Sequence, residues 1–384
     1  MAAVEPDHAA PGALASRAGR PALRRVREMR DMNGNLTRAA SGLMRVRSGA
    51  RRLLAVVLVS AAGAAAPAAA APELLIKMGT SAPDGSSWHQ IIKEMGEKWK
   101  QAPGGGVTLR IYPGGVLGDE PDLVRKMRIG QIQAAALTAV GLSNIDPSVA
   151  ALQIPMMFRS YEELDFVRER LRPMLEKRLE EKDFVVLNWG DAGWVMFFAK
   201  ERFSSPDDLK RMKLFVWAGD NDAVEVWKAS GFHPVPLATT DILPGLQSGL
   251  INAFDTTPLL ALASQWFGLA PYMLDLKWAP LVGATVVTRK AWERVPAEAR
   301  PFLLKTAAEA GERLRSDIRA ANDQAIEAMK KRGLTIVPLT PQAEAAWRKV
   351  AEAAYPKIRG PIVPAGMFDE VQRLRDESRA RAGK

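Results

Sequence analysis

The side chains with the most evident binding potential in this sequence are aromatic. Large aromatic residues are dense between positions 189 and 217, and those of interest are Trp189, Trp194, Phe197, Phe198, Phe215 and Trp217. Trp189 and Trp194 frame a glycine-containing stretch at the end of an expected strand, and open parallel sheets bind ligands at the carboxyl ends of strands. Indole rings are seldom fully buried, because they are large and their N–H needs a partner. Two interpretations stay open: core packing, which we favour for Phe197 and Phe198, and a cleft wall, which the two Trp would form.

Catalytic arrangements are sparse by comparison. The chain has no Cys and only three His, at positions 8, 89 and 233, which excludes disulfides, zinc–thiolate sites, iron–sulfur clusters and a Cys nucleophile. A lone His is more often structural than catalytic, so His89 is either structural or part of a cleft wall, and His233 is expected to be solvated. The sequence contains no nucleophile-elbow, zincin, Walker or dinucleotide-binding motif. We therefore expect a binding protein without cofactor or metal; an exported enzyme is the alternative.

Alternating strands and helices must position these side chains. Strands are predicted at 73–79, 107–112, 134–137, 184–189, 195–199, 213–217, 251–254 and 334–339. Helices are predicted at 88–100, 119–130, 223–230, 241–248 and 296–332, with a further helix starting at 205. Such alternation is typical of a parallel sheet covered by helices, so the predicted fold class is α/β. The helix over 296–332 would be roughly 45–55 Å long at 1.5 Å per residue, enough to pack across two lobes.

The positive charge of the chain is concentrated at its start. Residues 1–71 carry eleven Arg, no Lys and four acidic residues, which accounts for +7 of the net charge of +10. The remainder is close to neutral, so the charge gives little support to a nucleic-acid partner. Arg51 and Arg52 precede an apolar run that ends in small residues at Ala71, the pattern of a cleaved signal peptide. The alternative, a membrane span, is disfavoured because Gly63 and Pro67 interrupt the run.

Several segments share their order and spacing with a known family. They are Ile111–Glu120 (IYPGGVLGDE), Met127–Gln133 (MRIGQIQ), Ile154–Phe158 (IPMMF), Ser205–Lys213 (SPDDLKRMK), Val235–Leu237 (VPL) and Leu246–Asp255 (LQSGLINAFD). With these segments the chain resembles the DctP-like periplasmic solute receptors of tripartite ATP-independent periplasmic (TRAP) transporters, from Leu74 to about Phe368. The resemblance implies a two-lobe periplasmic-binding-protein fold of the type II-like form. It also implies a long lobe-spanning helix and a ligand cleft between the lobes.

The resemblance further implies a domain division and partners. Lobe I would comprise residues 72–195 plus about 281–320, and lobe II residues 196–280 plus about 321–384, after a cleaved leader at 1–71. The receptor would capture a small organic ligand in the periplasm and deliver it to TRAP membrane permease subunits, with no cofactor and no nucleic acid. A ligand sensor that docks on a membrane signalling partner is the alternative to transport.

One departure from the resembled family bears on the ligand. Many members carry an Arg that clamps a substrate carboxylate, and the matching position here is Phe215. A second Arg is common after an earlier Gly in the chain. Here that Gly is Gly193, and Trp194-Val195 follow it. A guanidinium forms two charge-assisted bonds with a carboxylate, which Phe cannot do. We predict a binding site composed of Trp88, Thr138, Trp189, Trp194, Phe215, Trp217, Asp255 and Thr256. Its aromatic members suit a neutral or apolar ligand, or a cation over Trp, while an organic acid is the family expectation.

Overall fold

The computed structural model describes residues 74–383, so the predicted leader at 1–71 and its cleavage site lie outside the described residues. Strands alternate with helices along this part of the chain, which confirms the α/β prediction. None of the helices in residues 74–383 is long and apolar enough to cross a membrane. The strands pair in one path, β2-β1-β3-β9-β4-β7-β5-β6, with two short strands beside it.

Five strands form the first half of this path: β1 (Leu74–Thr80), β2 (Val107–Tyr112), β3 (Ala134–Thr138), β4 (Phe184–Ala199) and β9 (Ala279–Thr288). β1 pairs in parallel with β2 and β3, because α1 (Ser87–Trp99) and α2 (Glu120–Arg128) return the chain between them. β9 runs antiparallel to both β3 and β4. The carboxyl ends of β1 and β3, at Thr80 and Thr138, consequently lie at the same edge.

The second half of the path continues from β4. It contains β5 (Lys213–Trp217), β6 (His233–Leu237) and β7 (Ala253–Thr256), with β8 (Tyr272–Leu274) and β10 (Thr335–Val337) beside it. β5 runs parallel to β6 and β7, and the intervening helices are α6 (Asn221–Ala229) and α7 (Ile242–Ser248). α8 (Pro258–Ala263) follows β7. The carboxyl end of β5 therefore lies at Trp217, just as the carboxyl ends of β1 and β3 lie at Thr80 and Thr138.

The long strand β4 connects the two halves. It pairs with β9 through Val195 and with β7 from Met196 onward. The sequence predicted two strands here, 184–189 and 195–199, and this is wrong: Phe184–Ala199 is one strand with register shifts. The second register shift lies at Gly193, whose φ is 118°. A side chain at this position would collide with the Asn322 amide. Gly193 thus forms a bulge inside a continuous strand and not a break in the chain.

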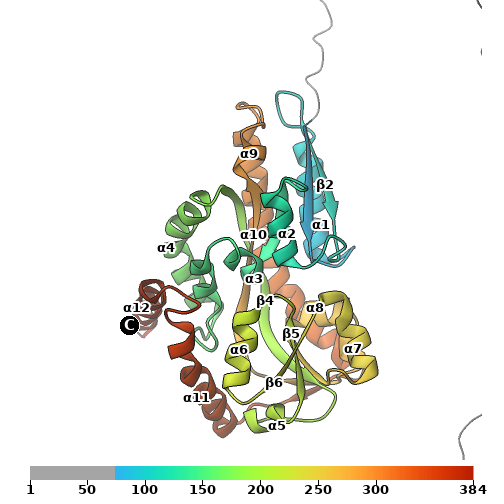
Figure 1. Cartoon of the computed structure of the whole chain (residues 1–384), viewed down its shortest axis with the longest axis vertical. Coiled ribbons are helices and arrows are strands. Elements are labelled where there is room, and N and C mark those ends of the chain that lie inside the picture. Colours follow the sequence, from blue (N-terminus) through green and yellow to red (C-terminus); the bar gives the residue numbers. More distant parts are fainter. Residues whose placement is uncertain (1–73, 384) are drawn as a thin grey trace, which may run out of the picture. The chain divides into compact units, whose positions relative to one another are not determined.

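The remaining helices cover the sheet. They are α3 (Ala139–Ser143), α4 (Tyr161–Glu180), α5 (Pro206–Lys210), α9 (Arg289–Trp292), α10 (Arg300–Lys330), α11 (Pro341–Ile358) and α12 (Ala365–Ala382). Three short 3₁₀ segments are η1 (Pro147–Gln153), η2 (Thr239–Asp241) and η3 (Trp266–Gly268). α10 has 31 residues and is roughly 46 Å long. Its first half, to Ile318, packs in the core beside α1, and Met329 packs in the core around β7, so it spans both halves (Figure 1).

The last helix packs against a helix of predicted lobe I, although it was itself assigned to lobe II. The sequence placed all of about 321–384 in lobe II, but α12 packs against α4 (Figure 1). The reason is its apolar face, since Met367, Phe368, Val371 and Leu374 are buried with the α4 residues in one core cluster. α11 packs instead with α5 and α6 on the second half through Trp347. The division of the chain into lobes stays a prediction.

Candidate functional site

A cavity of about 120 Å³ lies where parallel strands meet the crossing strand β4. Thr80 at the end of β1, Thr138 at the end of β3 and Trp217 at the end of β5 all line it. Ligands of open α/β sheets bind at such carboxyl ends. The cavity receives residues from both halves of the strand path, because Thr239 of η2 and Thr257 before α8 also line it.

Two acidic side chains at the start of α2 line the cavity. Glu120 accepts hydrogen bonds from the Thr138 N–H (2.9 Å), the Thr138 hydroxyl (2.8 Å) and the Gly141 N–H (2.8 Å). Burial raises the pKa of Glu120 above its ordinary value in spite of these bonds. Asp119 is the N-cap of α2 but makes no capping bond; its carboxylate accepts from the N–H (3.2 Å) and hydroxyl (2.8 Å) of Thr239. Asp119 thereby joins the two halves across the cavity.

Three buried side chains at the cavity each have an oxygen atom without a hydrogen-bond partner. They are Asn188 Oδ1 on β4, Thr257 Oγ1 after β7 and Thr285 Oγ1 on β9. These residues are 7%, 0% and 1% exposed. An unpaired buried polar atom costs about 1–3 kcal/mol, and most such atoms in native proteins have a partner. All three residues line this one cavity, which makes it the candidate site for a bound molecule.

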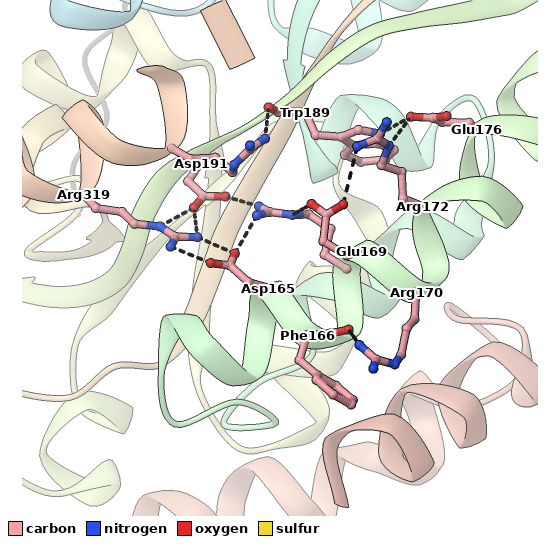
Figure 2. A network of polar contacts seen from close by, with 11 residues as sticks. Asp165, Phe166, Glu169, Arg170, Arg172, Glu176, Trp189, Asp191 and Arg319 are labelled. Atoms are coloured by element: carbon pink, nitrogen blue, oxygen red, sulfur yellow. Dashed lines mark hydrogen bonds and ion pairs between the residues drawn. The ribbon is translucent and has the colours of Figure 1, made fainter. Parts of the chain in front are cut away.

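A buried ion-pair network fixes the β4 wall of the cavity (Figure 2). Asp191 accepts from Arg168 (2.6 Å) and Arg319 (2.6 Å), and Asp165 on α4 binds the same two Arg (2.5 and 2.6 Å). Burial alone would lower the pKa of Arg319, but the carboxylates of Asp165 and Asp191 raise it. The Asp191 carbonyl accepts from Trp88 Nε1 at 3.1 Å. The network therefore holds the strand segment to which Trp88 is hydrogen-bonded.

A second cavity, of about 390 Å³, shares Val140 and Trp217 with the first. Asp220 and Asp255 line it, and burial raises the pKa of both, that of Asp255 to about 7 with a further contribution from the Asp220 charge. None of the unpartnered buried side-chain atoms identified in residues 74–383 belongs to its lining. The first cavity is therefore the better candidate for the ligand site.

The structure brings three of the eight predicted site residues into the first cavity: Trp88, Thr138 and Trp217. Trp88 Nε1 donates to a backbone carbonyl, and Trp217 Nε1 donates to the Thr239 hydroxyl at 3.2 Å. Because the protein itself satisfies both indole N–H groups, the two rings serve a ligand as apolar walls. Thr138 binds Glu120 and is less available to a ligand.

Two predicted Trp residues lie on the α4 side of β4. Trp189 Nε1 donates to Glu176 at 3.0 Å, and Trp194 packs against Tyr161 with ring centroids 5.4 Å apart. Both Trp are buried in the core cluster that contains α4, and neither lines the first cavity. Side chains alternate across a strand, so Trp189 and Asp191 share the α4 side while Asn188 contacts α10.

The other three predicted residues also lie outside the first cavity. Phe215 is 1% exposed in the core between β5 and α7, although its ring meets Trp217 edge-on at 5.1 Å. Thr256 is buried with its hydroxyl unpartnered, and Asp255 lines the second cavity. Phe197 and Phe198 are both fully buried, which confirms their core interpretation. His89, which the sequence left open as structural or part of a cleft wall, accepts from the Gly85 N–H (3.0 Å) and does not line either cavity.

Sequence reasoning missed most of the polar lining. Asn188 and Thr285 are polar residues inside mostly apolar strands, a pattern that can mark a functional position because polar residues are seldom buried without cause. Thr257 precedes Pro258 at the start of α8 and is adjacent to the predicted Thr256. Asp119 was assigned only to the start of the helix predicted at 119–130. Its contact with Thr239 joins positions 120 residues apart, which no local pattern reveals.

Residues 78–360 match the family model described as bacterial extracellular solute-binding protein, family 7 (DctP). The chain belongs to this family. DctP-family proteins are extracytoplasmic receptors, so the chain captures a small organic ligand outside the cytoplasm. Within residues 74–383, no group of three or more His, Cys, Asp or Glu is placed to hold a metal ion.

Relatives of known name agree with the DctP assignment. The chain is 24% identical over 274 residues to a solute-binding protein of Roseobacter denitrificans, covering 70% of this chain and 82% of the relative. It is 25% identical over 263 residues to the C4-dicarboxylate-binding periplasmic protein DctP of Rhodobacter capsulatus, covering 67% and 78%. Both relatives are matched over most of their length.

Solved structures of the same fold give a similar result. A TRAP periplasmic solute-binding protein of Ralstonia eutropha with bound (S)-2-acetolactate aligns with a TM-score of 0.73 and 22% identity, covering 79% of this chain and 99% of that one. One from Haemophilus influenzae with bound L-gulonate aligns with a TM-score of 0.73 and 19% identity, covering 80% and 100%. These similarities confirm the two-lobe TRAP-receptor fold for the DctP-family chain described here.

Proposed function

We propose that this chain is the periplasmic receptor of a TRAP-type transporter, which holds its solute in the 120 Å³ cavity and delivers it to membrane permease subunits. The observation that supports this most directly is the convergence of three unpartnered buried oxygen atoms on a cavity at the ends of parallel strands. A site of this kind binds through preplaced polar groups and apolar walls, as small-molecule sites commonly do. Export through the signal peptide at 1–71 is part of the proposal.

The contact between Asp119 and Thr239 gives the receptor a means of closing. The carboxylate of Asp119 lies on α2 and the N–H and hydroxyl of Thr239 lie on η2, so the bonds form only when the two halves approach. Trp217 Nε1 donates to the same hydroxyl, which places an aromatic wall at the closing contact. A solute would then be enclosed by groups from both halves, and its release would require these bonds to break.

The site also supports binding over turnover. In the part of the chain that the structure describes, its lining holds no Cys, His or Lys that could act as nucleophile or base, and its carboxyl groups at Asp119, Glu120 and Asp191 already accept hydrogen bonds. Catalysis needs a positioned acid, base or nucleophile within reach of the reacting atom. A receptor for transport is therefore the function that we propose in preference to an exported enzyme.

Native mass spectrometry of the mature chain, followed by identification of the released molecule, tests binding. Uptake of that molecule by cells with and without the chromosomal receptor then tests delivery. We expect one small molecule per chain, released chemically unchanged, and uptake that depends on the receptor. A molecule converted during incubation would instead make the chain an enzyme, and binding without uptake would favour the sensor alternative.

A further inference from the structure

The lining of the candidate cavity holds acidic side chains but no basic ones. Asp119, Glu120 and Asp191 contribute to it, whereas no Lys, Arg or His does so within residues 74–383. The larger neighbouring cavity likewise has Asp220, Asp222 and Asp255 in its lining and no basic residue in this part of the chain. A bound carboxylate would therefore meet no cation of the described protein at either place.

The nearest guanidinium groups are already used by the protein. Both Asp191 oxygens are bonded, Oδ1 by Arg168 and Oδ2 by Arg319, and Arg319 places its other nitrogen atoms on Asp165. Asp119 and Glu120 have no such counter-charge, because their hydrogen bonds come from neutral N–H and O–H groups. The uncompensated charge at the cavity is consequently negative, which repels an anionic ligand.

The unpartnered atoms indicate which hydrogen-bonding groups the ligand carries. Asn188 Oδ1 can only accept a hydrogen bond, and the hydroxyl oxygens of Thr257 and Thr285 accept as well as donate. A carboxylate could accept from the two Thr hydroxyls, but it has no hydrogen to donate to Asn188 Oδ1. A molecule with O–H or N–H groups would satisfy all three and leave its carbon atoms against Trp88 and Trp217.

We propose, on the basis of the proposed receptor function, that the solute carries hydrogen-bond donors and no anionic group. Its class is a small alcohol, amide or amine. The volume of about 120 Å³ limits its size, since a cavity of about 150 Å³ holds benzene in another protein. This selectivity departs from the organic acids bound in the solved structures from Ralstonia eutropha and Haemophilus influenzae.

The test is a panel of matched small molecules measured by calorimetry on the mature chain. Butanamide, butylamine and butyrate have nearly the same shape, as do propanamide, propylamine and propionate, so that only charge and donor groups change. We expect the amide or the amine of at least one series to bind at least tenfold more tightly than its carboxylate. Equal or tighter binding of the carboxylate overturns the proposal, and so does the absence of binding by every member at 10 mM.

Three Thr→Val variants separate the failure of this proposal from the failure of the receptor function. Thr257→Val and Thr285→Val remove a hydroxyl from the cavity at nearly constant shape, and each should weaken amide binding at least tenfold. Thr256→Val is the matched control, because Thr256 is also buried and unpartnered but does not line the cavity; its affinity should stay within twofold of the wild type. If a carboxylate binds the wild type and its binding is lost in Thr285→Val, the proposed ligand class is refuted but the cavity is still the solute site. If binding is the same in both cavity variants as in the wild type, the cavity is not the solute site.

The molecule that copurifies with the chain gives an independent result. Native mass spectrometry in both ion modes should reveal an uncharged or cationic compound. A copurified carboxylate or phosphate, released in stoichiometric amount, would contradict the proposal even if the synthetic panel agreed with it. Asp119→Asn should also reduce the discrimination against carboxylates, because it removes one negative charge while its amide oxygen can still accept from Thr239.

Discussion

Replacing Arg168 by Met should destabilise the protein strongly, although the substitution keeps most of the side-chain volume. The Arg168 side chain is 1% exposed and binds Asp191 at 2.6 Å and Asp165 at 2.5 Å. Removal of one partner from a buried ion pair costs about 3–5 kcal/mol, because a charge is left buried and unpaired. Arg319 still binds Asp191 in the variant, so we expect a loss near the lower end, about 3 kcal/mol.

The expected loss converts into a shift of the melting temperature. With an unfolding entropy of roughly 2.1 cal/mol/K per residue over positions 74–383, 3 kcal/mol corresponds to about 5 °C. Differential scanning calorimetry measures it directly. Arg172→Met is the matched control one turn along α4, where the side chain is 48% exposed and pairs with Glu169 and Glu176. Exposed pairs contribute about 0–1 kcal/mol, so this variant should melt within about 1.5 °C of the wild type.

The same pair of variants tests whether the network supports the site. Asp191 carries the carbonyl that accepts from Trp88 Nε1, so movement of this segment should also displace the cavity wall. Arg168→Met should weaken ligand binding, and Arg172→Met should not. Equal melting temperatures for the two variants would refute the structural role of the network, and unchanged affinity in Arg168→Met would refute its connection to the site.

Three further outcomes follow from the structure. The pKa of Asp255 in the folded protein is about 7, above its ordinary value of 3.8. Its contribution to stability is therefore fully present below pH 3.8 and is lost as the pH rises through 7. The melting temperature of Asp255→Asn should accordingly rise relative to that of the wild type between pH 5 and pH 8, and a constant difference would contradict this. Asn322→Ala should cost about 1–3 kcal/mol in chemical unfolding, because it leaves the Leu259 N–H and the Ala192 carbonyl unpaired at the β4 bulge; an unchanged midpoint would show that these bonds are dispensable. Phe215→Leu should reduce stability by about 1–2 kcal/mol and affinity by no more than about threefold, and a tenfold loss of affinity in calorimetry would return Phe215 to the binding site.

The fold was largely predictable because its signals are local. The strands at 107–112 and 213–217 were predicted with the bounds that the structure shows, since the first alternates apolar and polar residues and the second is a short apolar run. The long helix was recognised from its apolar stripe, and only its ends moved inward to Arg300 and Lys330. β4 was divided in two because Gly193 resembles a chain break, whereas in the fold it is a bulge stabilised by Asn322.

The site was less predictable because its partners are distant in sequence. Aromatic density directed attention to Trp217, which lines the cavity, and also to Trp189 and Trp194, whose burial against α4 depends on which side of β4 they occupy. A bulge adds one residue to the strand, so the side chains beyond it switch to the other face of the sheet. The sequence does not reveal where such a bulge lies. The unpartnered oxygens of Asn188, Thr257 and Thr285 come from three separate strands or strand ends, so only the assembled sheet reveals that they converge.

The missing carboxylate clamp and the buried network are two parts of one electrostatic arrangement. Position 215 carries Phe inside the core, so β5 offers no guanidinium to the cavity. On the opposite wall Arg168 and Arg319 approach the cavity residue Asp191, but their bonds to Asp191 and Asp165 hold them there. Redirecting either Arg to a ligand would leave a buried carboxylate unpaired, at a cost of about 3–5 kcal/mol. A carboxylate solute would have to repay that cost before it gained any affinity, which is why we expect this receptor to select a solute that donates hydrogen bonds instead.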